Sequence, residues 1–244
     1  MLNHLSDYQL LYLDIETVGA YPSYFDMPER IRLLWDKKAQ TLNYKGDQKP
    51  MNLFSRAGIY AEFGKIVCIS VGYVVKGSNK LRIKSFYGHH EQQLLREFAE
   101  LLRSHFNSPK HLMCAHNGKE FDFPYIARRM LIHGLELPAL LDIAGKKPWE
   151  VRHIDTLELW KFGDYKHFTS LDLLTAIFDI PSPKQDIDGS QVNEVYWKHN
   201  GLERIAEYCQ NDVLAVAQLF NRYRGQELFK EKNIEFVPLE EVVD

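Results

Sequence analysis

Five residues in three separate segments have side chains that can bind cations or handle protons. Asp14 and Glu16 are two positions apart, Tyr208 and Asp212 are four apart, and Asp122 lies between the two pairs. Carboxylates are hard oxygen ligands that suit Mg²⁺ or Mn²⁺, and a phenol beside them can orient a water molecule. These residue types predict a divalent-metal site, on the condition that the fold brings the three segments together.

The first pair lies in an apolar segment that predicts a strand. Alternate residues of a strand point to opposite faces, so within Leu10–Glu16 the two carboxylates share one face with Tyr12. Two carboxylates on one face of a buried strand are costly unless something neutralises them, and metal ions would do so. The alternative is a strand end that reaches solvent, with a turn that begins at Glu16.

Asp122 follows a short apolar segment and precedes a predicted helix. The segment His111–Ala115 predicts a buried strand, and a helix is expected from about Pro124. Asn117 and Gly118 are typical of a tight turn between two such elements, and a turn of this kind can bring backbone close to a ligand. The alternative is that Asp122 only caps the helix.

The second pair lies in a segment whose pattern predicts a long amphipathic helix, Leu202–Arg224. Positions i and i+4 share one face of a helix, so the Tyr208 phenol and the Asp212 carboxylate are expected to point to one place. The alternative is a local Tyr–Asp hydrogen bond or a surface pair without a catalytic role.

The rest of the chain predicts a mixed sheet flanked by helices. Further strands are expected at 65–75, 81–87 and 151–154, a turn at 77–79, and helices at 91–105, 124–133 and 169–178. Strands come first and then alternate with helices, which is typical of an α/β fold. We expect a single domain over residues 1–244, with an insertion at about 19–61 between the first two strands and a helix near 29–40.

The composition is that of a globular protein without a membrane segment. The net charge of −3 over 244 residues argues against a protein that coats long nucleic acid, but it permits one that grips a strand end. No stretch approaches the ~20 apolar residues of a spanning helix, and the first nine residues lack a signal-peptide pattern. The three cysteines are expected to be buried and reduced. We therefore expect a soluble, cytoplasmic protein.

Taken together, the three segments resemble the motifs of the DEDD exonuclease superfamily, in its tyrosine-bearing branch (DEDDy). The motifs are Asp14-Ile15-Glu16-Thr17, Asn117-Gly118-Lys119-Glu120-Phe121-Asp122 and Tyr208-Cys209-Gln210-Asn211-Asp212. A tyrosine, in place of a histidine five residues before the last aspartate, indicates this branch. The sequence also resembles the proofreading domain of family B DNA polymerases and free-standing bacterial proteins similar to it, over about residues 8–224, and residues 182–192 resemble the free-standing proteins.

The resemblance implies a ribonuclease H-like fold, two divalent ions (Mg²⁺ or Mn²⁺), and removal of nucleotides from the 3′ end of single-stranded nucleic acid, with DNA favoured. Two metals about 3.5–4 Å apart clamp the attacking and leaving oxygens of such a reaction. Asp14 would bridge both ions, Glu16 and Asp212 would hold the water-side ion, and Asp122 would serve the other through water. Tyr208 would orient the attacking water, because a reference pKa near ~10 makes a phenol a poor base.

Several residues near these motifs are candidates for contact with the nucleic acid. Thr17 is expected to bond the terminal nucleotide, and Phe121 to wedge or stack on a base; the alternatives are a turn residue and a core residue. The other candidates are Asn117, Lys119 and Lys184, with Arg128 and Arg129 as further candidates for phosphate contacts. For each basic residue the alternative is a solvated surface charge.

Two other functions stay open. The first is an exoribonuclease, since ribose selection depends on contacts to the 2′-OH that a sequence does not show. The second is an inactive nuclease-like binding module, against which the presence of all four carboxylates and the tyrosine argues. The chain is expected to work alone in repair or RNA turnover, or with a protein partner that the sequence does not identify. Asp155 predicts a capped helix start rather than a member of the catalytic set.

Overall fold

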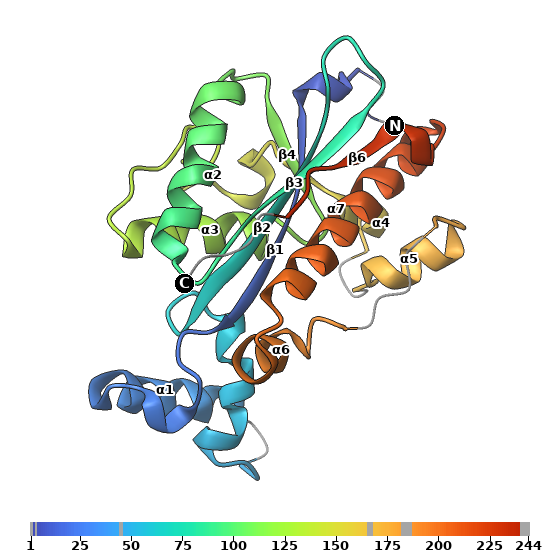
Figure 1. The fold of residues 1–244 in the computed structure, drawn as a ribbon. Coiled ribbons are helices and arrows are strands. Elements are labelled where there is room, and N and C mark those ends of the chain that lie inside the picture. Colours follow the sequence, from blue (N-terminus) through green and yellow to red (C-terminus); the bar gives the residue numbers. More distant parts are fainter. Residues whose placement is uncertain (1, 3, 44–45, 165–167, 182–186, 240–244) are drawn as a thin grey trace.

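A mixed six-stranded sheet forms the centre of the protein in the computed structural model (Figure 1). The structure describes all residues except 1, 3, 44–45, 165–167, 182–186 and 240–244. The strands are β1 (Leu10–Gly19), β2 (Gly64–Val74), β3 (Leu81–Tyr87), β4 (Leu112–Ala115), β5 (Ile154–Asp155) and β6 (Ile234–Phe236), in the order β5-β4-β1-β2-β3-β6. The strands β1, β2 and β3 are antiparallel neighbours, whereas β4 runs parallel to β1, β5 to β4, and β6 to β3.

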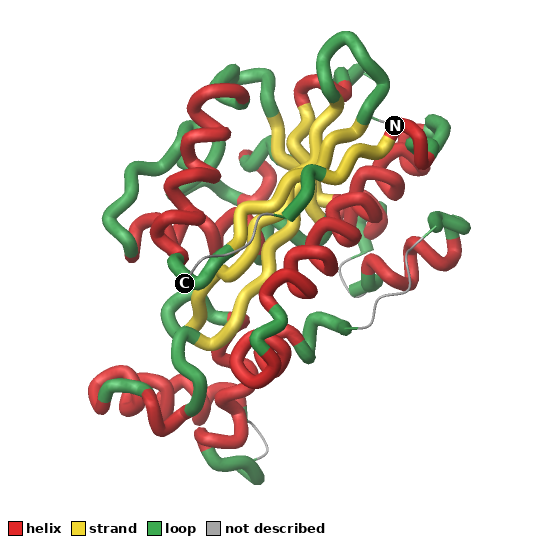
Figure 2. Tube along the Cα trace, viewed as in Figure 1, coloured by secondary structure: helices red, strands yellow, loops and turns green. Residues whose placement is uncertain are grey.

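Helices flank the sheet on both sides, as the yellow strands between red helices in Figure 2 show. The helices are α1 (Glu29–Leu42), α2 (Glu91–His105), α3 (Asp122–Ile132), α4 (Thr156–Lys161), α5 (Leu171–Ile177), α6 (Val192–His199) and α7 (Leu202–Arg224). Short 3-10 segments are η1 (Asp7–Gln9), η2 (Tyr24–Asp26), η3 (Pro50–Ile59), η4 (Pro148–Glu150) and η5 (Glu231–Asn233). The helices α2 and α3 lie on one side of the sheet, and α7 crosses the other with α6 near its start (Figure 1).

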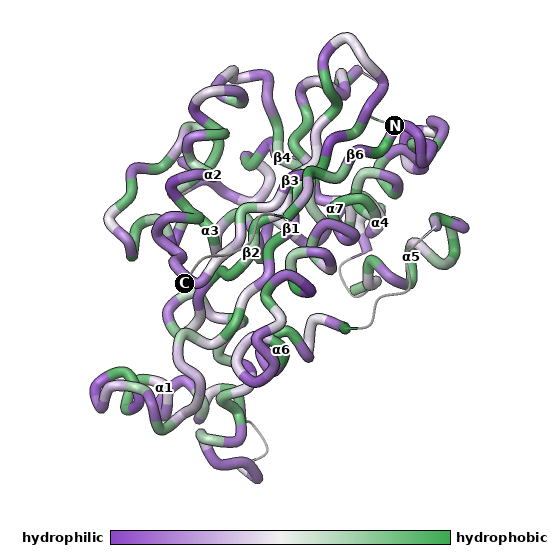
Figure 3. The backbone as a smooth tube through the Cα atoms, viewed as in Figure 1, coloured by the Kyte–Doolittle hydropathy of each residue, from purple (hydrophilic) through white to green (hydrophobic). Residues whose placement is uncertain are grey.

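Alternation along β1 separates two layers of the core. Leu11, Leu13 and Ile15 are buried in the layer that α2 and α3 cover, whereas Leu10 and Tyr12 are buried against α7. In Figure 3 green hydrophobic segments follow the strands in the middle of the molecule. The face that also carries the even-numbered acidic residues of β1 is therefore the α7 face, as the period of the sequence predicts.

The predicted fold class is confirmed: the protein is an α/β structure with a mixed sheet flanked by helices, the architecture expected of a ribonuclease H-like fold. The predicted cysteines are confirmed as free, buried thiols. Within the described residues, we find no helix that combines the length and the apolar character needed to cross a bilayer.

Four elements differ from the predicted ones. The fifth strand, predicted over 151–154, consists only of Ile154–Asp155, because it pairs with just the last two residues of β4. The helix predicted over 169–178 begins at Leu171, after Ser170 caps it. The sequence pattern does not predict α6 or β6. The strand β6 is three residues long and only partly buried, so it has too little apolar pattern to be recognised.

Candidate active site

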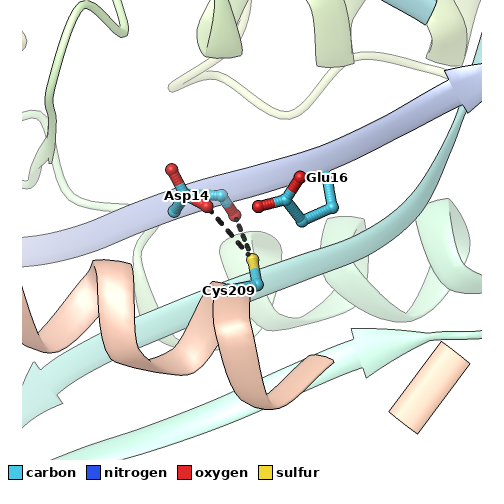
Figure 4. A group of neighbouring side chains, drawn as sticks. All are labelled: Asp14, Glu16 and Cys209. Atoms are coloured by element: carbon cyan, nitrogen blue, oxygen red, sulfur yellow. Dashed lines mark hydrogen bonds between the residues drawn. The ribbon is translucent and has the colours of Figure 1, made fainter. Parts of the chain in front are cut away.

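The strand β1 places Asp14 and Glu16 next to a thiol of α7 (Figure 4). One ligand atom each from Asp14, Glu16 and Cys209 lie within 4.8 Å of one another. The Cys209 thiol donates to Oδ2 of Asp14 at 3.3 Å and to its backbone oxygen at 3.4 Å. A shift of register in the β1–β2 pairing falls directly after Glu16, between it and Thr17. Asp14 is partly exposed and Glu16 is buried, so the pair lies largely inside the protein rather than on its surface.

Asp122 is the first residue of α3, and its carboxylate is buried near β1. The side chain accepts backbone hydrogen bonds from its own amide and from Ile15 of β1. Its other oxygen, Oδ1, is buried and has no hydrogen-bond partner among the residues that the structure describes. An unpaired buried carboxylate oxygen is costly, and a bound cation would remove that cost.

The helix α7 carries Tyr208 and Asp212 on one face, as predicted. The Tyr208 phenol is hydrogen-bonded to the Asp212 carboxylate. Burial raises the pKa of Tyr208 well above its ordinary value, and the negative charges of Asp212, Glu16 and Asp14 raise it further. The phenol therefore stays protonated at neutral pH and acts as a hydrogen-bond donor. Cys209, three positions before Asp212, lies on the same helical face.

Mutual repulsion links the four carboxylates. Burial raises the pKa of Asp14 and of Glu16, and for both the strongest charged contribution is Asp212, with Asp122 contributing as well. Burial also raises the pKa of Asp122 to about 7, with help from the charges of Asp155 and Asp212. Acidic groups can raise each other's pKa in this way only when they lie close together. The structure thus brings the three predicted segments to one place.

This donor set suits a divalent cation. Carboxylate oxygens are the ligands that Mg²⁺ and Mn²⁺ prefer, and the orphaned oxygen of Asp122 supplies an unused acceptor. The charged groups that act on Asp14 are the carboxylates of Asp212, Glu16 and Asp122, and all three raise its pKa. Cations are the partners that such a cluster of anions requires.

The turn that leads to Asp122 is fixed by Asp155, a role that sequence reasoning missed. Asn117 adopts a left-handed conformation, with φ +64°. The Asp155 carboxylate accepts the backbone amides of Asn117 at 2.9 Å and Lys119 at 3.1 Å. It also caps α4, as predicted, by accepting two amides of that helix. The spacing of a helix cap was visible in the sequence. Nothing local indicated that the same carboxylate also holds a turn 38 positions earlier in the chain, at Asn117.

The candidates for contact with nucleic acid occupy varied surroundings. The Thr17 hydroxyl, at the end of the acidic motif, is hydrogen-bonded to the Tyr125 phenol. The Phe121 ring is half-buried and packs against Tyr125 at 5.3 Å between centroids, which makes it part of the wall of the core. The Asn117 side chain is half-buried in the turn.

The basic candidates divide into paired, exposed and buried residues. The Lys119 ammonium forms an ion pair with Glu158 at 2.6 Å, and Arg128 is exposed. Arg129 corrects the expectation of a phosphate contact or a solvated charge: it is 8% exposed and its guanidinium is bound to the Glu91 carboxylate. Lys184 lies outside the described residues.

Two histidines near the motifs are hydrogen-bonded to other segments of the chain. His116 bonds the Thr156 hydroxyl and the Thr169 carbonyl, each at 2.9 Å, and thereby connects the turn before Asp122 to the segment before α5. His153 accepts from the Met113 amide and contacts the Leu140 carbonyl, and burial lowers its pKa to about 4. Both side chains act as neutral links between segments.

The chain is similar in sequence to DNA polymerases. The chain is 22% identical to a DNA polymerase of Pyrococcus glycovorans over 57% of its length, and 23% identical to DNA polymerase 1 of Pyrococcus abyssi over 69%. It spans 18% and 23% of those polymerases, respectively. The solved structure of a family B DNA polymerase from Pyrobaculum calidifontis aligns with 85% of this chain, and the alignment covers 24% of the polymerase chain. The TM-score is 0.48 and the sequence identity is 16%.

A family model matches residues 59–233, which is more than half of the chain. The matched range includes Asp122, Tyr208 and Asp212, whereas Asp14 and Glu16 precede it. The family is described as a predicted 3′-5′ exonuclease related to the exonuclease domain of PolB. The extent of this match shows that the chain belongs to that family of PolB-related predicted 3′-5′ exonucleases.

Proposed function

We propose that this protein is a divalent-metal-dependent exonuclease that removes nucleotides from the 3′ end of single-stranded DNA. The observation that carries the proposal is the convergence of Asp14, Glu16, Asp122 and Asp212, which act on one another electrostatically although β1, α3 and α7 supply them from distant parts of the chain. Membership of the exonuclease family supports the direction of cleavage. The DNA polymerases among its relatives support DNA as the substrate.

In this proposal the four carboxylates hold two divalent ions, Mg²⁺ or Mn²⁺. When bound, such ions neutralise charge on the attacking and leaving oxygens of an in-line phosphodiester hydrolysis. Asp14 would be the central ligand, because its carboxylate lies beside both Glu16 and the α7 residues. Asp122 contributes its orphaned oxygen from the α3 side. The four negative charges balance the charge of two divalent cations. Without metal, burial raises the pKa values of Asp14, Glu16 and Asp122, and the charges of their acidic neighbours raise them further.

Tyr208 is proposed as a positioning residue. Its phenol stays protonated and is hydrogen-bonded to Asp212, so it fixes that carboxylate and offers a polar group to water or substrate. It does not remove a proton, because its pKa is raised far above neutral pH. Cys209 holds Asp14 from the same helix through its thiol.

The test uses 5′-labelled single-stranded DNA and RNA oligonucleotides of one sequence, with Mn²⁺, with Mg²⁺ and with EDTA. We expect a ladder that shortens one nucleotide at a time from the 3′ end of the DNA, and none in EDTA. Asp14→Ala and Asp212→Ala should reduce cleavage to background, whereas Asp172→Ala, which removes an exposed carboxylate of α5, should not.

Each outcome decides a part of the proposal. Cleavage of RNA in preference to DNA would replace the proposed substrate with RNA and leave the site intact. Retained cleavage in Asp14→Ala or Asp212→Ala, or a wild-type protein without metal-dependent cleavage of either strand, would refute the proposed activity.

A further inference from the structure

A second polar cavity lies at the far end of β1, beyond the carboxylates. It has a volume of about 630 Å³. The residues that line it come from the segments after β1 and after β3, from the start of β2, and from α2 and α3. Its basic residues are Lys65, His89, His90, Arg96, Arg129 and His133. Ala20, which lines the cavity just after β1, lies four positions from Glu16, or roughly 13 Å at about 3.3 Å per residue, and Lys65 pairs with Val18 of β1. The four carboxylates of the proposed active site are not among the residues that line this cavity.

The single carboxylate among the lining residues is already neutralised inside the protein. Glu91 is 6% exposed. Its oxygens accept the Ile66 amide at 2.7 Å, the Arg129 Nε at 2.8 Å and the His133 ring at 2.7 Å. Because this carboxylate is bound on several sides by donors, its charge is directed into the protein and compensated there. Burial lowers the pKa of Lys65, and the Glu91 charge opposes that shift without reversing it.

Two further cations are held at the cavity without a carboxylate. The Lys65 ammonium donates to the Tyr196 hydroxyl at 2.8 Å and lies over the rings of Tyr196 and Trp197, at 4.7 and 4.9 Å from their centroids. Arg96 is exposed on α2, one helical turn after Gln92. Throughout the described ranges, no carboxylate is within ion-pair distance of Lys65 or Arg96. The cavity therefore carries an excess of positive charge.

The backbone adds to this positive field. The 15-residue helix α2 begins at Glu91, and residues of its first turn line the cavity. The amino end of a helix carries partial positive charge, and its first amides lack partners within the helix. His90, which precedes the helix, and Arg96 stand at the exposed side of the cavity, where a ligand from solvent would arrive.

We propose that this cavity binds a phosphate group. Fixed cations, helix amides and imidazole donors are the groups with which proteins bind phosphate. The volume admits a ligand as large as a nucleoside monophosphate, which is the product class of the proposed reaction; this part of the inference rests on the proposed function. A free phosphate, a mononucleotide and a phosphate within a nucleic-acid strand share the chemistry that the cavity recognises.

The experiment measures binding by isothermal titration calorimetry in EDTA, so that the acidic active site, free of metal, repels anionic probes. The probes are inorganic phosphate, thymidine monophosphate, thymidine and a ten-nucleotide single strand. Arg96→Gln and His90→Gln remove exposed cavity residues. Arg103→Gln removes the same charge from α2 outside the cavity, and circular dichroism checks that all variants are folded.

We expect at least one phosphate-bearing probe to bind the wild type, and thymidine not to bind. Arg96→Gln should weaken that binding about tenfold, the size of one lost charge-assisted hydrogen bond, and His90→Gln should weaken it less. Arg103→Gln should not change it. Which probe binds identifies the source of the phosphate.

Equal affinities of wild type, Arg96→Gln and His90→Gln for every probe would overturn the inference, as would binding of thymidine equal to that of its monophosphate. The outcome is independent of the proposed nuclease activity. An Asp14→Ala variant should lose hydrolysis and keep phosphate binding, and Arg96→Gln should show the weakened phosphate binding and keep metal-dependent hydrolysis of a dinucleotide.

Discussion

Replacement of Asp122 by asparagine is expected to stabilise the metal-free protein while it weakens the response to metal. Asp122 is 4% exposed. Burial, with the charges of Asp155 and Asp212, raises its pKa to about 7 from an ordinary value of 3.8. Between these two values the folded protein binds more protons at Asp122 than the unfolded chain does, so stability falls as the pH rises through that window.

The size of the effect follows from the same two values. The interval from 3.8 to about 7 corresponds to roughly 4 kcal/mol at ~1.4 kcal/mol per pH unit, which is the full cost of ionising Asp122 above pH 7. At pH 5 the cost is roughly 2 kcal/mol by the same conversion. Asparagine removes this cost but weakens two backbone hydrogen bonds, at about 1 kcal/mol each. We therefore expect a net gain of about 2 kcal/mol at pH 8 and almost none at pH 5.

Urea unfolding of wild type and Asp122→Asn, in EDTA at both pH values, measures this difference. With Mn²⁺ at about a hundred times its Kd, wild type should gain about 2.7 kcal/mol, and the variant should gain less because it has lost a ligand. Asp172→Asn, on the exposed side of α5, should change neither result. A variant that is less stable than wild type at pH 8 in EDTA, or that gains equally at both pH values, would refute the electrostatic account.

Other variants test the neighbours of the cluster. Asp155→Ala should lower the free energy of unfolding in urea by about 3 kcal/mol, because four backbone amides lose a buried acceptor; a loss below about 1 kcal/mol would contradict this role. Tyr208→Phe should slow cleavage of a labelled strand by less than Asp14→Ala or Asp212→Ala, since the phenol positions and does not take a proton; an equal loss would show that it does more. Cys209→Ala should weaken Mn²⁺ binding in calorimetry about tenfold and Cys209→Ser by less, whereas equal affinity in all three proteins would mean that the thiol does not orient Asp14.

The sequence predicts the helices and strands whose hydrophobic residues recur at a regular spacing. It also predicts which residues of such an element share a face. Alternation in β1 is sufficient to put Asp14 and Glu16 on one face, because strand geometry allows no other arrangement. The four-residue spacing in α7 likewise puts Tyr208 and Asp212 side by side. Both arrangements are found in the structure. Local geometry was sufficient in each case because the partners belong to one element.

Contacts between distant segments could not be predicted in this way. The burial of Arg129 depends on Glu91 of another helix, and a basic residue on an amphipathic pattern looks the same whether it meets solvent or a buried carboxylate. The contact between Cys209 and Asp14 spans 195 positions, although the spacing of Cys209 from Asp212 was a usable signal that the thiol shares their face. The capping pattern at Asp155 predicted its local role and not its bonds to the turn before α3.

The most direct test of the central claim is a crystal structure of the protein soaked in Mn²⁺, with anomalous scattering used to locate the ions. We predict two Mn²⁺ peaks among the carboxylates of Asp14, Glu16, Asp122 and Asp212, and loss of peaks in crystals of Asp14→Ala. Manganese bound elsewhere, with no peak within ligand distance of these four carboxylates, would contradict the account.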